Sequence, residues 1–404
     1  MTAGPAERPE VRPARGTRPV NRRQLIIAAA TDLFSRKGYA GVSMGDVAEA
    51  VAIGPSALYR HFRGKQELLA TVVTEALDTL DAGLAKAEEE HPPDAVHALA
   101  TAVLEHRTVG ILWQREARQL PPAERAAIQT AVNDIARRFA TFIQVRRPGL
   151  SDGQARLLAW SGLAVATSVS YHSLTLPEPA FTTLLGELIT VAIYAPIPPF
   201  ESTSARHAQP PTLRSQSRRE TILTEATKLF AANGFSGVST EDIGASVGIA
   251  GPSVYNHFPA KSDILVAAML RGDEWLRMDM NRAFAAASDP RDGLNRLLGS
   301  YCAFVLDNPH LVGVLVSEAD HLPEPERHRT RVAQHAYIAE WVTLLREVHP
   351  QWDAVTARIR VQAALTVMND IALIPSLREG SDIKSAMVTI GAELLETTGQ
   401  TRPT

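Results

Sequence analysis

The chain of 404 residues has a single cysteine, Cys302, and aromatic residues make up only 6% of it. One cysteine excludes a disulfide within the chain and a zinc site built on cysteines, and it suits the reducing cytoplasm, where we expect the protein. Histidine, aspartate and glutamate nowhere show metal-ligand spacing, so the sequence predicts no metal site and indicates no cofactor. Abundant alanine and leucine favour helix.

Long apolar segments are also lacking. Four arginines near the N-terminus are followed by no apolar stretch, so no secretory signal is expected. The longest stretch without Asp, Glu, Lys or Arg, residues 157–177, contains Ser161, Thr167 and His172 among other polar residues, which are costly in lipid. We therefore expect no membrane span, and we interpret this stretch as a helix buried at an interface.

Enzyme motifs are missing as well. No nucleophile elbow, Walker loop or dinucleotide fingerprint lies at a strand–helix junction, because the pattern contains almost no strands. We therefore expect no enzyme, although a catalytic carboxylate or metal in a body pocket would reopen that class.

Charge is spread unevenly along the chain, whose net charge is −3. Residues 1–70 hold eleven Lys and Arg against six Asp and Glu, a balance of +5, whereas residues 201–265 hold six of each. A basic N-terminal end on an acidic body suits local contact with phosphates.

The chain contains two copies of one pattern, a unit of about 196 residues. An offset of 196 pairs, without a gap, Leu33 with Leu229, Gly38 with Gly234, Ser43 with Ser239, Asp46 with Asp242, Tyr59 with Tyr255, His61 with His257 and Lys65 with Lys261. A fainter copy at offset 202 pairs Glu116–Pro121 with Glu318–Pro323. The sequence therefore predicts a duplicated unit.

Each copy begins with a pattern of helices and a tight turn. Gly38 ends the first helix, Ser43 and Asp46 form a capping box for the second, and Pro55 opens the third at its first position. In the first copy we expect helices at residues 21–36, 44–50, 55–62 and 65–80, and the last of these recurs at 261–278. This order is the helix-turn-helix pattern.

The third helix has two sides. Leu58 and Phe62, four residues apart, face the core, and the side chains between them face outward toward a major groove. Tyr59 and His61 taken singly favour a packing role, but their recurrence as Tyr255 and His257 beside Lys261 favours DNA contact. The predicted DNA-binding residues are Ser43, Pro55, Ser56, Ala57, Tyr59, Arg60, His61 and Lys65, with Ser239, Gly251, Pro252, Ser253, Tyr255, Asn256, His257 and Lys261 in the second copy.

These motifs resemble a known family. Gly38-Tyr39, Val42-Ser43, Leu58-Tyr59-Arg60-His61-Phe62 and Lys65, with Val254-Tyr255-Asn256-His257-Phe258 and Lys261, look like the DNA-binding domain of the TetR/AcrR repressors, written twice. The tandem form, including Trp113–Arg118, is similar to actinobacterial double-repeat regulators of lipid-import operons. The resemblance implies an all-α fold of two tandem units, each a helix-turn-helix domain followed by a helical ligand-binding and dimerisation domain.

Some positions depart from the family pattern. Ala52 replaces the turn glycine that Gly248 keeps, and alanine is tolerable there if the turn is not left-handed. Gly54 and Ala250 replace the usual Ser or Thr cap of the third helix, and alanine caps poorly. The exposed faces also differ, since Arg60 suits guanine and Asn256 suits adenine. We therefore expect two unlike half-sites.

The rest of each copy reads as five further helices. The pairs at 154–175 with 181–194 and at 356–374 with 383–395 are apolar on most sides, so they are expected to be buried between partners. Because family members pair such helices between subunits, we expect an intramolecular pseudo-dimer, with a homodimer of four modules as the alternative. Candidate ligand residues are Trp113, Arg115, Glu116 and Arg118, with Glu318, Asp320 and His321; surface ion pairs are an equal interpretation.

The predicted organisation is a disordered arm at 1–20, helix-turn-helix domains at 21–70 and 218–266, regulatory domains at 71–195 and 267–404, and a linker at 196–217. The expected partners are a double-stranded DNA operator and a small-molecule effector such as a lipid or an acyl-CoA-like compound, with no membrane. The resemblance favours a repressor whose ligand shifts the fourth helix of each copy. The alternative is a partner-binding or architectural protein in which the second helix-turn-helix does not bind DNA.

Overall fold

The computed structural model describes residues 21–89, 92–201 and 217–396, and every regular element in these ranges is a helix. The predicted all-α class is therefore confirmed. The predicted arm at 1–20 and most of the predicted linker lie outside the described residues.

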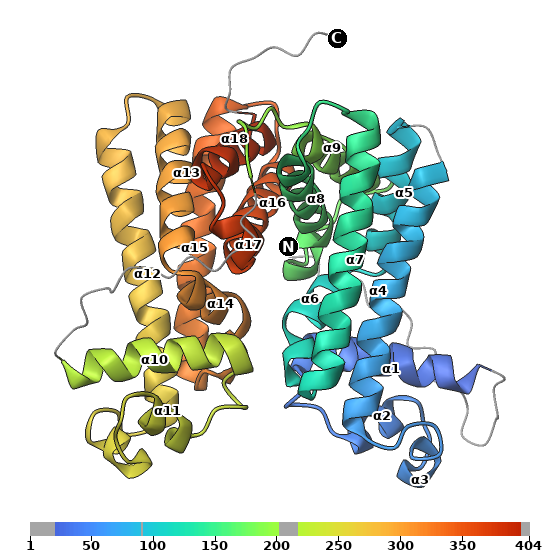
Figure 1. Cartoon of the computed structure of the whole chain (residues 1–404), viewed down its shortest axis with the longest axis vertical. Coiled ribbons are helices and arrows are strands. Elements are labelled where there is room, and N and C mark those ends of the chain that lie inside the picture. The colour runs from blue at the N-terminus through green and yellow to red at the C-terminus, as the bar shows by residue number, and fades with distance from the viewer. Residues whose placement is uncertain (1–20, 90–91, 202–216, 397–404) are drawn as a thin grey trace, which may run out of the picture. The chain divides into compact units, whose positions relative to one another are not determined.

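The two copies fold into matching series of helices (Figure 1). The first series comprises α1 (Arg22–Lys37), α2 (Met44–Ala50), α3 (Pro55–Leu58), α4 (Lys65–Glu89), α5 (Pro92–Glu105), α6 (Val109–Gln114), the 3₁₀ turn η1 (Glu116–Gln119), α7 (Pro122–Arg146), α8 (Asp152–Ser168), η2 (Val169–Tyr171) and α9 (Ala180–Tyr194). The second comprises α10 (Arg218–Asn233), α11 (Thr240–Ser246), η3 (Gly251–Asn256), α12 (Lys261–Ala286), α13 (Pro290–Asp307), α14 (Pro309–Ser317), η4 (Ala319–His321), α15 (Glu324–Val348), α16 (Ala354–Leu373), α17 (Pro375–Arg378) and α18 (Ile383–Leu394).

Helix ends differ from the prediction in three places. The third helix stops at Leu58 instead of Phe62, and the chain continues in tighter turns, with the N–H of His61 bonded to the carbonyl of Leu58 at 2.9 Å. The fourth helix is longer than expected in both copies, reaching Glu89 and Ala286. The helix predicted at 154–175 ends at Ser168, where a 3₁₀ turn follows.

The chain divides into two compact units. The first contains residues up to Asp78 together with Thr108–Gln129, so α6 and η1 belong with the first helix-turn-helix. The second contains Thr79–Arg107 and everything from Thr130 onward. Within the first unit, Glu116 of η1 accepts the N–H of Tyr39, two residues beyond the end of α1. The domain boundary at residue 70 stays a prediction.

Within the second unit, the apolar helices of the two copies form a shared core. Helix α8 packs against α9 and α16, and α18 packs against α16 and α9. All but three residues of α8 are buried, as expected of an interface helix that is apolar on most sides. None of the helices in the described parts of the chain is long and apolar enough to span a membrane.

The start of the predicted linker is anchored to this core. The hydroxyl of Ser151 donates to the carbonyl of Phe200 at 3.0 Å, and the Gln154 amide donates to the carbonyl of Pro198 at 3.1 Å. The Phe200 ring is 1% exposed and lies so close over Gly380 that a Cβ there would come within 2.5 Å of it. This segment therefore fastens the first copy to the turn before α18.

Candidate nucleic-acid interface

Both helix-turn-helix modules begin with the predicted capping box. The Ser43 hydroxyl accepts the N–H of Asp46 at 3.1 Å, while the Asp46 carboxylate accepts the N–H of Ser43 at 2.6 Å. Ser239 and Asp242 repeat both bonds. The Ser43 hydroxyl and N–H together hold the pKa of the Asp46 carboxyl below its usual value, so the cap stays charged at neutral pH.

The first module presents an exposed polar face beside a buried anchor. Leu58 and Phe62 are buried, as predicted from their spacing of four residues. Tyr59 is 53% exposed, and Arg60 and His61 beside it are also exposed. Of the other predicted contacts, Ser43, Pro55 and Ser56 are exposed and Ala57 and Lys65 are half-buried.

The second module repeats this arrangement with a tighter helix. Here η3 is a 3₁₀ helix, with Val254 and Phe258 buried and Tyr255 49% exposed. Neither α3 nor η3 receives a side-chain hydrogen bond at its N-cap. Ser239, Pro252 and Asn256 are exposed, and Ser253, His257 and Lys261 are half-buried.

Gly251 is the exception among the predicted contacts, because it is buried. A Cβ at this position would lie 3.1 Å from the Cα of Glu241 in α11. The glycine thus permits η3 to approach α11 closely and offers no side-chain surface to DNA.

The turn between the second and third helices corrects one expectation. Ala52 has a φ of 54°, so the turn is left-handed in the first module, as it is at Gly248 with a φ of 71°. The N–H of Ile53 bonds to the carbonyl of Ala48 at 2.9 Å, and Ile249 repeats the bond to Gly244. This closure of the helix end forces the left-handed residue, and alanine occupies it at a conformational cost.

The two predicted phosphate lysines are partly engaged within the chain. The ammonium of Lys261 donates to the carbonyls of Phe235 at 2.9 Å and Val238 at 2.7 Å. The ammonium of Lys65 lies 4.0 Å from the centre of the Tyr39 ring. Burial lowers the pKa of both lysines. An ammonium has three N–H donors, so Lys261 keeps one for another partner.

The two glutamates among the candidate ligand residues are buried and bonded to the turn that follows the first helix of their module. Glu116 is 3% exposed and accepts the backbone N–H of Tyr39 at 2.7 Å, and Glu318 is 1% exposed and accepts that of Phe235 at 2.9 Å. His321 lies 3.3 Å from the Glu318 carboxylate. Trp113 on α6 and Arg118 on η1 are half-buried, and Asp320 on η4 is exposed. The sequence repeat at offset 202 identified these matched positions, but it could not show their hydrogen-bond partners.

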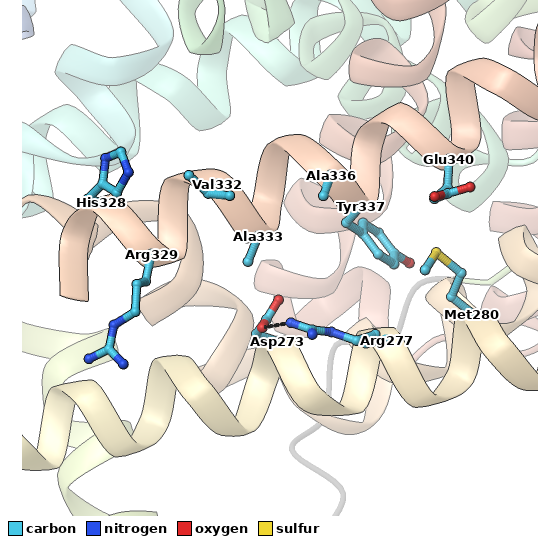
Figure 2. A pocket seen from close by; sticks show the side chains of 10 residues that line it. All are labelled: Asp273, Arg277, Met280, His328, Arg329, Val332, Ala333, Ala336, Tyr337 and Glu340. Atoms are coloured by element: carbon cyan, nitrogen blue, oxygen red, sulfur yellow. Dashed lines mark hydrogen bonds and ion pairs between the residues drawn. The ribbon is translucent and has the colours of Figure 1, made fainter. Parts of the chain in front are cut away.

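A pocket that the sequence did not indicate opens between α12 and α15, with a volume of about 520 Å³. Figure 2 shows Tyr337 and Ala333 from α15 and Met280 from α12 lining it, with the Asp273–Arg277 ion pair along one side. Arg329 and Glu340 add charged groups to the lining of this pocket, and His328 adds a polar ring. Among the described residues, no group of three His, Cys, Asp or Glu side chains could hold a metal ion.

Comparison with known proteins places these modules. The profile of "Bacterial regulatory proteins, tetR family" matches twice, at residues 26–72 and 222–268, which are the two helix-turn-helix segments. The HTH-type transcriptional regulator LmrA of Bacillus subtilis is 31% identical over 156 residues, which cover 37% of this chain and 80% of LmrA. The chain belongs to the TetR family.

Other TetR-family relatives differ in the direction of regulation. The HTH-type transcriptional activator FasR of Mycolicibacterium smegmatis is 28% identical over 187 residues, covering 43% of this chain and 84% of FasR. The HTH-type transcriptional repressor KstR2 of the same organism is 23% identical over 146 residues, covering 35% of this chain and 70% of KstR2. This TetR-family protein is thus a DNA-binding transcriptional regulator with two helix-turn-helix modules.

Proposed function

We propose that the chain is a ligand-released repressor that reads an operator of two unlike half-sites, one with each module. The observation that supports this most is the repeated geometry with different side chains. Tyr59-Arg60 and Tyr255-Asn256 stand exposed at the same place beside buried anchors, and arginine pairs with guanine where asparagine pairs with adenine.

The exposed side chains divide into two roles. Arg60 and Asn256 read base edges, with Ser56 and Ser253 beside them. Tyr59, Tyr255, His61, His257 and the two lysines donate to phosphates and fix the register on the duplex. Few phosphate-binding cations contribute, so the salt dependence of binding is modest.

The effector enters the pocket between α12 and α15. Its apolar wall and charged edge suit an amphipathic small molecule, such as a lipid or an acyl-CoA-like compound. Asp273, Arg277 and Met280 line this pocket on the same helix that begins at Lys261. Since a helix transmits displacement along its axis, a ligand that parts α12 from α15 shifts the start of α12 and releases DNA.

One chain acts as an internal dimer. The contacts of α8 with α16 and of α9 with α18 use the helix pair that the family resemblance assigns to dimerisation. In this organisation the DNA-binding domains are 21–70 and 218–266, and the regulatory domains follow each of them.

A second candidate function keeps DNA binding in the first module only. Residues 201–265, which include the second module, have no net positive charge. Two N–H groups of the Lys261 ammonium donate to backbone carbonyls within the chain. In that case the second module binds a partner or holds the fold.

Footprinting on the DNA upstream of the chain's own gene distinguishes these functions. Two unlike protected half-sites about one helical turn apart support a single chain with two readers, and a longer repeated footprint means two chains. Tyr59→Ala with Lys65→Ala should abolish protection, and Tyr255→Ala with Lys261→Ala should do so at the other half-site. If the Tyr255→Ala, Lys261→Ala variant binds as the wild type does, only the first module binds DNA.

A further inference from the structure

Two buried carboxylates lie outside the DNA-reading faces, at the same place in each copy. Glu116 opens η1 and Glu318 directly precedes η4, and both are almost fully buried. A buried carboxylate is unfavourable unless hydrogen bonds satisfy it. Such a group recurring in both copies therefore needs a structural or functional reason.

Each carboxylate accepts the backbone N–H of the residue after the glycine that ends the first helix of its module. These bonds are Tyr39 N–H to Glu116 Oε2 at 2.7 Å and Phe235 N–H to Glu318 Oε2 at 2.9 Å. The glycines, Gly38 and Gly234, have φ values of 69° and 71°. The turn that they open is thus held by the glutamate at η1 in the first copy and by the glutamate just before η4 in the second.

Neighbouring groups strengthen the tie differently in the two copies. In the first, Arg115 pairs with the Glu116 carboxylate and donates to the carbonyl of Ser35 at 3.0 Å. In the second, the Ser317 hydroxyl donates to Glu318 Oε1 at 3.0 Å, and His321 Nε2 lies 3.1 Å from the hydroxyl of Ser236. Beside the backbone N–H, the Glu116 carboxylate is thus paired with a charged guanidinium, whereas the Glu318 carboxylate accepts from a neutral hydroxyl.

The same turn is also bonded to the fourth helix. Phe235 gives its N–H to Glu318 and its carbonyl accepts Lys261, the first residue of α12, at 2.9 Å. In the first module Lys65, the first residue of α4, lies against the Tyr39 ring. One residue of the turn is therefore in contact both with the buried glutamate and with the first residue of the fourth helix.

We propose that Glu116 and Glu318 are positioning residues that set the orientation of the DNA-reading face relative to the 3₁₀ turns η1 and η4. The inference rests on the proposed function of both modules as DNA readers. Losing the carboxylate frees the turn before α2 or α11, which carries α3 or η3 with it. Operator affinity falls, while non-specific affinity, which needs only exposed cations, stays.

The test uses the full chain, an operator selected with the wild-type protein, and DNA of random sequence. Because a hydrogen bond to a charged group is lost, Glu116→Ala and Glu318→Ala are expected to lower operator affinity about tenfold or more. Protection weakens first at the half-site of the altered module. Random-DNA affinity stays within about twofold of the wild type, since phosphate contacts are kept. Glu124→Ala, an exposed carboxylate on α7, is the control.

The glutamine variants separate positioning from simple stability. Glu318→Gln keeps an oxygen for Phe235 N–H and turns its amide toward the Ser317 hydroxyl, so operator affinity stays near the wild-type value. Glu116→Gln turns its amide toward the Arg115 guanidinium and loses affinity. Hydrogen exchange of the Phe235 amide speeds up in Glu318→Ala and not in Glu318→Gln.

Three results would overturn the inference, and each has a distinct meaning. If Asn256→Ala loses its half-site while Glu318→Ala binds as the wild type does, the positioning role is wrong and the proposed function stands. If operator and random-DNA affinity fall together with the urea midpoint, Glu318 only stabilises the fold. If the wild type protects no half-site, the proposed function fails and the inference fails with it.

Discussion

In the first module Arg60 stands exposed between Tyr59 and His61, and in the second Asn256 stands between Tyr255 and His257. Around these positions the capping boxes, the left-handed turns and the buried anchors repeat. The capping Ser43 and Asp46 and the buried Phe62 recur unchanged as Ser239, Asp242 and Phe258. The turn residue and the second anchor change identity but keep their conformation or burial, whereas the exposed reader changes its chemistry. The duplication therefore kept the scaffold and changed what each module presents.

The regulatory parts differ more deeply than the modules do. In the first copy Asp81 on α4 pairs with Arg138 on α7 at 2.7 Å. The matching positions in the second copy carry the opposite charges, Arg277 and Glu340, yet Arg277 pairs with Asp273 on its own helix at 2.5 Å. The pocket between α12 and α15 opens where that bridge between helices is missing.

Aromatic side chains accompany this difference. Tyr301, Tyr337 and Trp341 pack with ring centres 6.1 to 6.3 Å apart beside the pocket. At an offset of 202 the first copy has Ile135 and Phe139 in place of Tyr337 and Trp341. The second copy is thus the one in which we expect the effector to bind.

The largest expected effect on stability comes from removing the Phe200 contact that connects the two copies. Phe200→Ala removes a ring that is 1% exposed over Gly380, and deleting a buried phenylalanine costs about 3–5 kcal/mol of unfolding free energy. Urea unfolding measures this loss. Val145→Ala, at a side chain that is 72% exposed, should change little. Equal stability of the two variants would mean that the segment does not fasten the copies.

Acid tests a second buried group of the first copy, the imidazole of His172. Burial, then Arg107 and Arg358, lower the pKa of His172 to about 4 from 6.5. The unfolded chain therefore takes up the proton first, and the free energy of unfolding falls as pH drops from 6.5 toward 4, by at most about 3.4 kcal/mol at 1.36 kcal/mol per pKa unit.

Unfolding midpoints between pH 7 and pH 4 check this expectation. His172→Gln should flatten the pH dependence, whereas His106→Gln, at an exposed position, should leave it. A wild-type curve that matches His172→Gln would contradict the buried neutral histidine.

Filling the pocket between α12 and α15 tests whether the effector binds in the second copy and not in the first. Ala333→Trp places an indole in the pocket and should weaken binding of a fluorescent fatty acid about tenfold or more, because the bulk displaces the apolar chain. Ala131→Trp is the matched change on the exposed face of α7 in the first copy and should have no effect. Equal loss, or none in either variant, would move the effector site elsewhere.

The smallest expected effect comes from exchanging the left-handed turn residues, Ala52 and Gly248. Ala52→Gly should raise the unfolding free energy by about 1 kcal/mol, and Gly248→Ala should lower it similarly, because a left-handed alanine costs about 1–2 kcal/mol. No heavy atom lies within 4 Å of a Cβ at Gly248, so conformation alone accounts for the change. Thermal unfolding of both variants measures it, and shifts of the same sign would refute the account.

Local signals made the helices predictable. Ser43 with Asp46, Pro55 and Gly38 act within a few residues, so their spacing alone places the helix ends. The left-handed Ala52 was not predictable from residue type, because closure of the helix end overrides the preference of alanine. The pocket depends on the separation of Met280 and Tyr337, which are far apart in sequence, and no local pattern reports it. Glu116 was recognisable as special by its recurrence, but its backbone partner depends on tertiary structure.

The central claim is that the two modules read different bases, and one measurement tests it directly. Footprints of the wild type, Arg60→Ala and Asn256→Ala are compared on an operator selected with the wild-type chain. Each variant should lose about 1–3 kcal/mol of binding free energy and relax base preference at one half-site only, a different one for each. If both variants weaken the same half-site, or Asn256→Ala changes nothing, the two modules are not independent readers.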